Sequence, residues 1–82
     1  MYSVVFSDLA LKQLKKLPNE IQHRIIATIE RCRIRPYAYL KKLSGNPYFR
    51  LRIGDYRVIL DVQQNEVRIF VIEVGHRKDI YD

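Results

Sequence analysis

The first part of the chain places hydrophobic side chains at helical spacing. A first run of such positions follows Ser7 and Asp8, either of which can cap a helix. This first run contains Ala10, Leu11, Leu14 and Leu17. A second run contains Ile21, Ile25, Ile26, Ile29 and Cys32. Because proline cannot continue a helix, Pro18 separates the two helices and Pro36 ends the second. The pattern predicts an αα-hairpin with one shared apolar seam.

Strand-like segments lie on both sides of these helices. Residues 2–6 are rich in β-branched and aromatic side chains and predict a first strand. Residues 36–47 form a connector, with glycine and proline gathered near its end. After this connector the hydrophobic period changes from about 3.6 to two, so residues 48–53 predict a half-buried strand with a basic outer face.

The C-terminal third predicts two more strands. Gly54-Asp55 is a good signal for a tight turn into a strand over residues 56–62. After a polar turn at 63–66, residues 67–74 are nearly all β-branched or aromatic and predict a central strand buried on both faces. Gly75 is expected to close this strand. Because the connecting turns are short, the last three strands should form an antiparallel meander.

These elements predict an α+β fold in the order β-α-α-β-β-β. The expected architecture is a small antiparallel-rich sheet with the N-terminal helical hairpin packed on one face. The other face of the sheet is then left free to bind a partner. Residues 1–82 should form one domain, because a chain of 82 residues has room for a single modest core.

The composition excludes several classes of protein. The longest apolar run is four residues, far short of a membrane span, and the N-terminus lacks the basic segment of a signal peptide. Cys32 is the only cysteine, which rules out an internal disulfide and a zinc site built from thiolates. Its place on the apolar helix face favours core packing over a reactive thiol. We therefore expect a cytoplasmic protein without a bound metal or cofactor.

Positive charge is concentrated in the middle of the chain. Residues 31–60 carry eight basic side chains and one acidic side chain, whereas the net charge of the whole chain is +6. Such a concentration is the electrostatic footprint of a protein that binds a polyanion, either a nucleic acid or an acidic protein. A solvated basic surface without a partner is the plainer alternative.

Arginines near the predicted hairpin are placed to share one surface. Arg50 and Arg52 lie two residues apart on a strand and therefore project from the same face. Arg57 follows the tight turn, which brings it near Arg52, and Arg77 follows the last strand. Guanidinium groups on one face repel each other and so favour an anionic ligand that bridges them. The guanidinium fork, which donates two hydrogen bonds at once, suits a phosphate.

The reaction that fits such a surface is cleavage of RNA by attack of a 2′-hydroxyl on its adjacent phosphate. This reaction requires positive groups for the phosphorane, which Arg57 and Arg77 could supply, and groups that move protons. Tyr81 or His76 could move protons, and imidazole is chemically the better base. Each residue also has a structural alternative: the arginines could pair with neighbouring carboxylates, and Tyr81 could simply pack its ring.

Three segments resemble the RelE/ParE superfamily of toxins from toxin–antitoxin systems. They are residues 42–45 (Lys-Leu-Ser-Gly), 48–59 (Tyr-Phe-Arg-Leu-Arg-Ile-Gly-Asp-Tyr-Arg-Val-Ile) and 74–81 (Val-Gly-His-Arg-Lys-Asp-Ile-Tyr). The resemblance covers nearly the whole chain, and the Arg-x-Gly-Asp-Tyr-Arg run is its most specific part. The RelE branch implies a metal-independent, ribosome-dependent endoribonuclease that cuts mRNA in the A site. It also implies a cognate RelB-like antitoxin that silences the toxin, with a toxin–antitoxin heterotetramer as a possible assembly.

The resemblance also implies roles for individual residues. Arg57 and Arg77 match the two arginines of the family, and Tyr81 matches its C-terminal tyrosine. Arg50 and Arg52 match a basic pair that is lysine in the best-known RelE enzymes, where one lysine is a candidate proton acceptor. Because arginine keeps its proton, this departure leaves Tyr81 or His76 as the proton acceptor. Five further basic residues are expected to bind phosphates of the ribosome or the message: Arg50, Arg52, Lys41, Lys42 and Lys78.

Two other functions are compatible with this sequence. The ParE branch shares the fold but poisons DNA gyrase without nuclease chemistry. The joint presence of Arg57, Arg77 and Tyr81 favours the RelE branch over the ParE branch. A plain binding module, or a decayed toxin that still binds its antitoxin, is the third interpretation.

Overall fold

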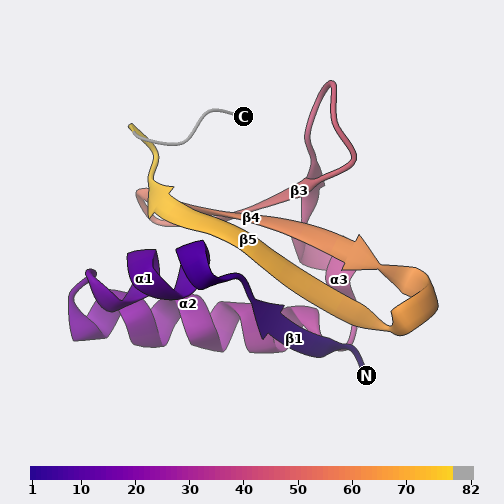
Figure 1. Ribbon diagram of the computed structural model, residues 1–82, viewed down its shortest axis with the longest axis horizontal. Coiled ribbons are helices and arrows are strands. Elements are labelled where there is room, and N and C mark those ends of the chain that lie inside the picture. Colours follow the sequence, from indigo (N-terminus) through magenta and orange to yellow (C-terminus); the bar gives the residue numbers. More distant parts are fainter. Residues whose placement is uncertain (79–82) are drawn as a thin grey trace.

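The computed structural model describes residues 1–78 and contains a mixed β-sheet and two main helices (Figure 1). The N-terminal elements are β1 (Ser3–Phe6), α1 (Asp8–Lys15) and α2 (Asn19–Cys32). A short helix α3 (Pro36–Tyr39) and a short strand β2 (Lys41–Lys42) follow. The C-terminal elements are β3 (Phe49–Ile53), β4 (Tyr56–Gln63), a 3₁₀ turn (Gln64–Glu66) and β5 (Arg68–His76).

Within residues 1–78 the sheet has the strand order β1-β5-β4-β3-β2. The strands β2 to β5 pair antiparallel, and β1 pairs parallel with β5 at the far edge. Figure 1 shows α1 and α2 together on one side of the sheet, with the β2–β3 loop rising on the other side. The predicted α+β class and the antiparallel meander are therefore confirmed.

Helix α1 begins at a serine that also ties it to the sheet. The Ser7 hydroxyl accepts a hydrogen bond from the Ala10 backbone N–H at 2.9 Å, as an N-cap does, and donates one to the Ile72 carbonyl at 2.7 Å. Further along α1, the Gln13 side-chain oxygen accepts from the Val74 N–H at 2.7 Å. Since β1 pairs with β5 only as far as Val71, these two side chains satisfy the edge of β5 beyond β1.

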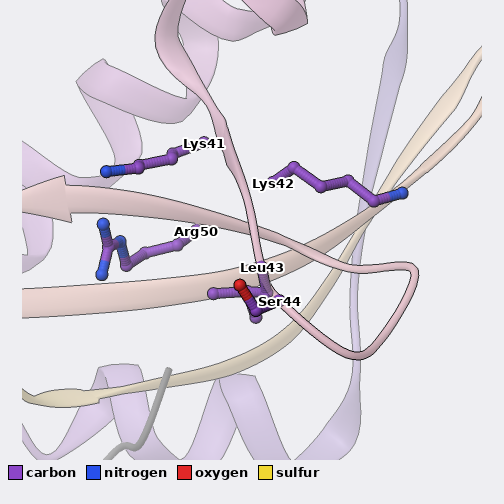
Figure 2. A pocket seen from close by; sticks show the side chains of 5 residues that line it. All are labelled: Lys41, Lys42, Leu43, Ser44 and Arg50. Carbon is purple, nitrogen blue, oxygen red and sulfur yellow. The ribbon is translucent and has the colours of Figure 1, made fainter.

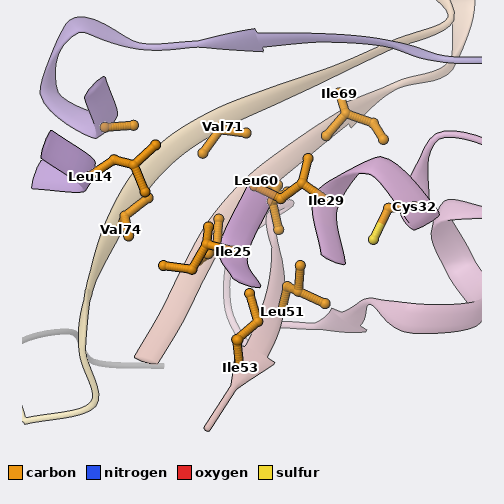
Figure 3. Packing of buried hydrophobic residues seen from close by; sticks show 12 residues of the cluster. Leu14, Ile25, Ile29, Cys32, Leu51, Ile53, Leu60, Ile69, Val71 and Val74 are labelled. Carbon is orange, nitrogen blue, oxygen red and sulfur yellow. The ribbon is translucent and has the colours of Figure 1, made fainter. Parts of the chain in front are cut away.

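The core lies between the two helices and the sheet (Figure 3). It takes side chains from α1, α2 and the central strands. Each fully buried aliphatic side chain stabilises the fold by about 1.5–3 kcal/mol. The fully buried larger members are Ile25, Cys32, Val58, Leu60, Ile69, Val71 and Val74. Cys32 is a free cysteine inside this core, and burial raises the pKa of its thiol to about 11. Core packing of this residue is thus confirmed.

The segment between the helices and the hairpin differs from the prediction. Helix α2 ends at Cys32 because the chain then pairs with the N-terminus: Tyr2 N–H donates to the Arg33 carbonyl at 2.8 Å, and Arg33 Nε donates to the Tyr2 carbonyl at 2.9 Å. Pro36 begins α3, since its fixed φ suits the first helical position. The connector over 36–47 therefore holds a helix and an edge strand, which pairs with β3.

The last strand also differs in burial and in length. Ile69, Val71 and Val74 are buried towards the helices, whereas Phe70 and Ile72 are half-buried, so β5 is not buried on both faces. No helix within residues 1–78 covers its second face. The strand continues past Gly75 to His76, because its neighbour β4 extends far enough to pair with it. In the described part of the chain, no helix is long and apolar enough to cross a bilayer.

Candidate nucleic-acid interface

Three arginines of the β3–β4 hairpin lie on the face of the sheet that α1 and α2 leave uncovered. Directly opposed residues of an antiparallel pair point to the same side. Arg52 opposes Arg57, and Arg50 opposes the outer residue Ile59, whereas Leu51 opposes Val58 in the core. Arg50, Arg52 and Arg57 therefore share the uncovered side, which we call the open face. The predicted same-face placement of Arg50 and Arg52 is confirmed.

Electrostatics show that Arg77 joins this group. The pKa of Arg57 is lowered from its usual value, first by burial and then by the positive charges of Arg50, Arg52 and Arg77. Charges that act on one guanidinium in this way must lie near it. We call these four residues the arginine cluster. Since arginine keeps its proton at physiological pH, the cluster is a concentration of positive charge on the open face.

A backbone contact fixes the segment that carries Arg77. The Arg77 N–H donates to the Asp55 carbonyl at 2.8 Å, which joins the turn after β5 to the turn between β3 and β4. Gly54 permits that second turn because its φ is +58°, a left-handed conformation that favours glycine. Two turns far apart in sequence are thereby held together at one end of the sheet. This arrangement places the backbone of Arg77 beside the hairpin turn that precedes Arg57.

His76 lies on the other side of the sheet from the arginine cluster. It opposes Tyr56, whose ring packs against the core, and the two rings meet edge to face with centroids 5.4 Å apart. His76 Nδ1 accepts a hydrogen bond from the Lys78 N–H at 3.3 Å. A neutral ring with this bond carries its proton on Nε2. The structure therefore does not bring His76 together with the arginines of the open face.

The predicted phosphate-binding lysines are divided between the two faces. Lys41 opposes Arg50 and shares the open face, whereas Lys42 opposes Phe49. The Lys42 ammonium lies 5.2 Å from the centroid of the Phe49 ring, a cation–π contact on the helix side. Figure 2 shows Lys41 and Arg50 extended in one direction and Lys42 in the opposite direction. Lys78 is exposed in the turn after β5, and Tyr81 lies outside the described residues.

A small pocket opens beside the arginine cluster. It has a volume of about 220 Å³ and is lined by Lys41, Lys42, Leu43, Ser44 and Arg50 (Figure 2). Its polar side chains are all cations apart from one hydroxyl, so it is suited to an anion. A larger hollow of about 410 Å³ lies at the junction of α2 and α3, between Arg31, Ile34, Arg35 and Tyr39. None of its lining residues belongs to β3, β4 or β5, so it is separate from the arginine cluster.

Sequence reasoning did not assign a role to Ser44 or Tyr56. Ser44 reaches the pocket because β2 pairs with β3, and nothing in the pattern of residues 40–43 signalled a strand. Tyr56 could have been found from the alternation of residues 56–62, which places it on the core side of the hairpin. Within residues 1–78, no group of three or more His, Cys, Asp and Glu side chains could hold a metal ion. Anion binding is the chemistry that the described arrangement supports.

Comparison with known proteins gives consistent relatives. A family model described as the ParE toxin of type II toxin–antitoxin systems, parDE, matches residues 4–81. The chain is 36% identical to Toxin RelE3 of Methanocaldococcus jannaschii, over 96% of this chain and 94% of that protein. It is 30% identical to the mRNA interferase toxin RelE of Escherichia coli K12, over 94% and 84% of the two chains. The fold resembles the solved toxin–antitoxin complex RelBE2 of Mycobacterium tuberculosis, with a TM-score of 0.85, 25% identity, and 93% and 98% coverage.

Proposed function

Since this chain belongs to the ParE toxin family of type II toxin–antitoxin systems, we propose that it is a toxin of the RelE type that cleaves messenger RNA on the ribosome. The relatives that it matches carry names of the RelE type, and two of them are named mRNA interferases. The observation that carries the proposal is the arginine cluster on the open face. The positive charges of Arg50, Arg52 and Arg77, which act on the guanidinium of Arg57, are balanced when a phosphodiester binds among them.

The proposed reaction is an internal transfer at phosphorus. The 2′-hydroxyl of the message gives up its proton as its oxygen forms a bond to the adjacent phosphorus. The bond from phosphorus to the 5′-oxygen of the next nucleotide breaks, and that oxygen takes up a proton. The products are a 2′,3′-cyclic phosphate and a 5′-hydroxyl. Arg57 and Arg77 stabilise the dianionic phosphorane, while Arg50 and Arg52 hold other phosphates of the message or the ribosome. Because the nucleophile belongs to the RNA and the charge is supplied by arginines, the reaction requires no metal ion.

Proton transfer falls to a group other than the cluster itself. Arginine does not give up its proton, so Arg50 and Arg52 cannot act as the base that lysine can be in related enzymes. Tyr81 is the proposed proton-transfer or base-stacking residue. His76 remains the alternative from sequence, although it lies on the opposite face from the cluster. Substitution of Tyr81 by phenylalanine separates stacking from proton transfer, since only the ring is kept.

The proposed partners are the ribosome with its message and a RelB-like antitoxin. Lys41, Lys42 and Lys78 add positive charge around the cluster for ribosomal or messenger phosphates. Several solved neighbours are RelE toxins bound to RelB antitoxins, including the intact RelBE complex of Escherichia coli with a TM-score of 0.82 and 27% identity. An acidic, amphipathic antitoxin would neutralise the open face, in a possible heterotetramer. Its association should weaken as salt rises.

The test is cleavage of a defined message on programmed ribosomes, with the new ends mapped. Arg57→Ala and Arg77→Ala should abolish cutting, whereas Arg68→Ala should retain it. Arg68 is a matched control because it lies at the opposite end of β5, opposed to Gln63. Cutting by Arg57→Ala at the wild-type rate would overturn the site. Inhibition of gyrase supercoiling without cleavage of any message would instead support the ParE-type function.

A further inference from the structure

The pocket at the junction of β2 and β3 is a built feature of the open face. Lys41 and Arg50 are directly opposed across the two strands, so their cationic ends leave the sheet on the same side. Leu43 forms the apolar part of the lining and is buried with Ile59, and the half-buried Ile72 packs against both. Its burial fixes the backbone from which Ser44 extends. The pocket is thus held by packing beneath it.

The loop that carries Ser44 is closed by its own hydrogen bonds. The Leu43 N–H donates to the Tyr48 carbonyl at 3.0 Å, and the Asn46 side-chain oxygen accepts from the Tyr48 N–H at 2.9 Å. Gly45 turns the chain with a φ of +79°. These contacts hold the loop backbone at Ser44, whose side chain lines the pocket together with Lys41 and Arg50. An ammonium, a guanidinium and a hydroxyl together present donors to an oxyanion.

Arg50 connects this pocket with the arginine cluster. It lines the pocket, and its charge also lowers the pKa of Arg57. An anion in the pocket therefore lies next to an anion held by Arg57 and Arg77. No acidic side chain is among the lining residues, so nothing in the lining repels a second phosphate.

We propose that Lys41, Ser44 and Arg50 form a subsite for a message phosphate that neighbours the scissile one. The proposal rests on the RNA-cleaving function above and adds a second, non-reacting contact to the same strand. Binding at this subsite holds the message in register and makes no contact with the reacting atoms. Its loss should therefore weaken binding of the message while leaving the rate of the bound complex nearly unchanged.

The experiment uses messages in which a single linkage flanking the cleavage site is replaced by an uncharged methylphosphonate. Each message is bound to programmed ribosomes, and cleavage is followed at increasing toxin concentration. For wild type, neutralising one flanking linkage should raise the half-saturating toxin concentration about tenfold. Lys41→Ala should raise it by a similar factor with the intact message. Lys41→Ala should then show no further loss with that same methylphosphonate message, because the contact is already absent.

Lys15→Ala is the control for this coupling, since Lys15 is an exposed lysine of α1 and is not among the residues that line the pocket. For this variant, the methylphosphonate should raise the half-saturating toxin concentration by the same factor as for wild type. Lys16→Ala, an exposed change at the end of α1, monitors basal cleavage, and thermal melting confirms that each variant is folded. If every methylphosphonate message raises the half-saturating concentration of Lys41→Ala as much as that of wild type, the pocket does not hold a message phosphate and the proposed subsite is wrong. This conclusion about the subsite holds when wild type cleaves the message and Arg57→Ala does not. If wild type cuts no message at all, the proposed function fails together with the subsite.

Discussion

Substitution of Ser7 by alanine tests how the first helix is fixed to the sheet. The Ser7 hydroxyl makes two hydrogen bonds, one from the Ala10 N–H at 2.9 Å and one to the Ile72 carbonyl at 2.7 Å. Loss of the N-cap bond costs about 1 kcal/mol. The second loss leaves a half-buried carbonyl without this donor and costs about 1 kcal/mol more. The free energy of unfolding should therefore fall by roughly 2 kcal/mol, which lowers Tm by roughly 8–16 °C in a domain of this size.

Urea denaturation measures this change directly, because the midpoint should fall while the m-value is unchanged. Ser7→Thr keeps both a hydroxyl donor and an acceptor, so it should retain most of the stability. Ser3→Ala is the matched control, since Ser3 is exposed on β1. A free energy of unfolding for Ser7→Ala within about 0.5 kcal/mol of wild type would refute this account of how α1 is fixed.

Three further predictions concern the cluster, the turn that carries Arg77 and the buried thiol. Arg57→Gln should slow message cleavage by about 10²–10³-fold. It should also raise the urea midpoint, because folding buries Arg57 and holds it among like charges, and both effects lower its pKa; a lower midpoint would contradict this origin of the shift. His76→Asn should cut nearly as well as wild type, because asparagine can accept from the Lys78 N–H as the imidazole does. His76→Phe lacks this acceptor and should lose about fivefold in cleavage, so equal rates for the two variants would exclude positioning by the hydrogen bond. The pKa of Cys32 rises to about 11 on folding, so stability should fall as pH increases from 9 towards 11. Cys32→Ala, measured by urea midpoints over the same range, should lose less stability than wild type.

The sequence predicted most of the fold because its strongest local signals agree with the tertiary structure. The helical spacing of Ile25 and Ile29, and the Gly54-Asp55 turn, each appear as expected. The segment 36–47 was missed because its structure depends on partners distant in sequence. Strand β2 exists through pairing with β3. A two-residue edge strand has too few positions to show a period.

For the candidate site, local rules predicted which residues share a strand face but could not establish the pairing across the sheet. The convergence of Arg50 and Arg52 follows from the two-residue period of one strand. The division of Lys41 from Lys42 depends on the β2–β3 register, and no local rule supplied it. His76 directly precedes Arg77 in the sequence, but successive side chains of a strand point to opposite faces of the sheet. Adjacency in the sequence therefore could not predict that His76 lies on the other face from the arginine cluster.

A double-mutant cycle on Arg57 and Arg77, measured as single-turnover cleavage of a ribosome-bound message, tests the claim that both guanidiniums act on one phosphate. If both stabilise the same phosphorane, Arg57→Ala/Arg77→Ala should lose much less than the product of the two single losses. Full multiplication of the two losses, or a single variant that cuts at the wild-type rate, would contradict a shared phosphate on the open face.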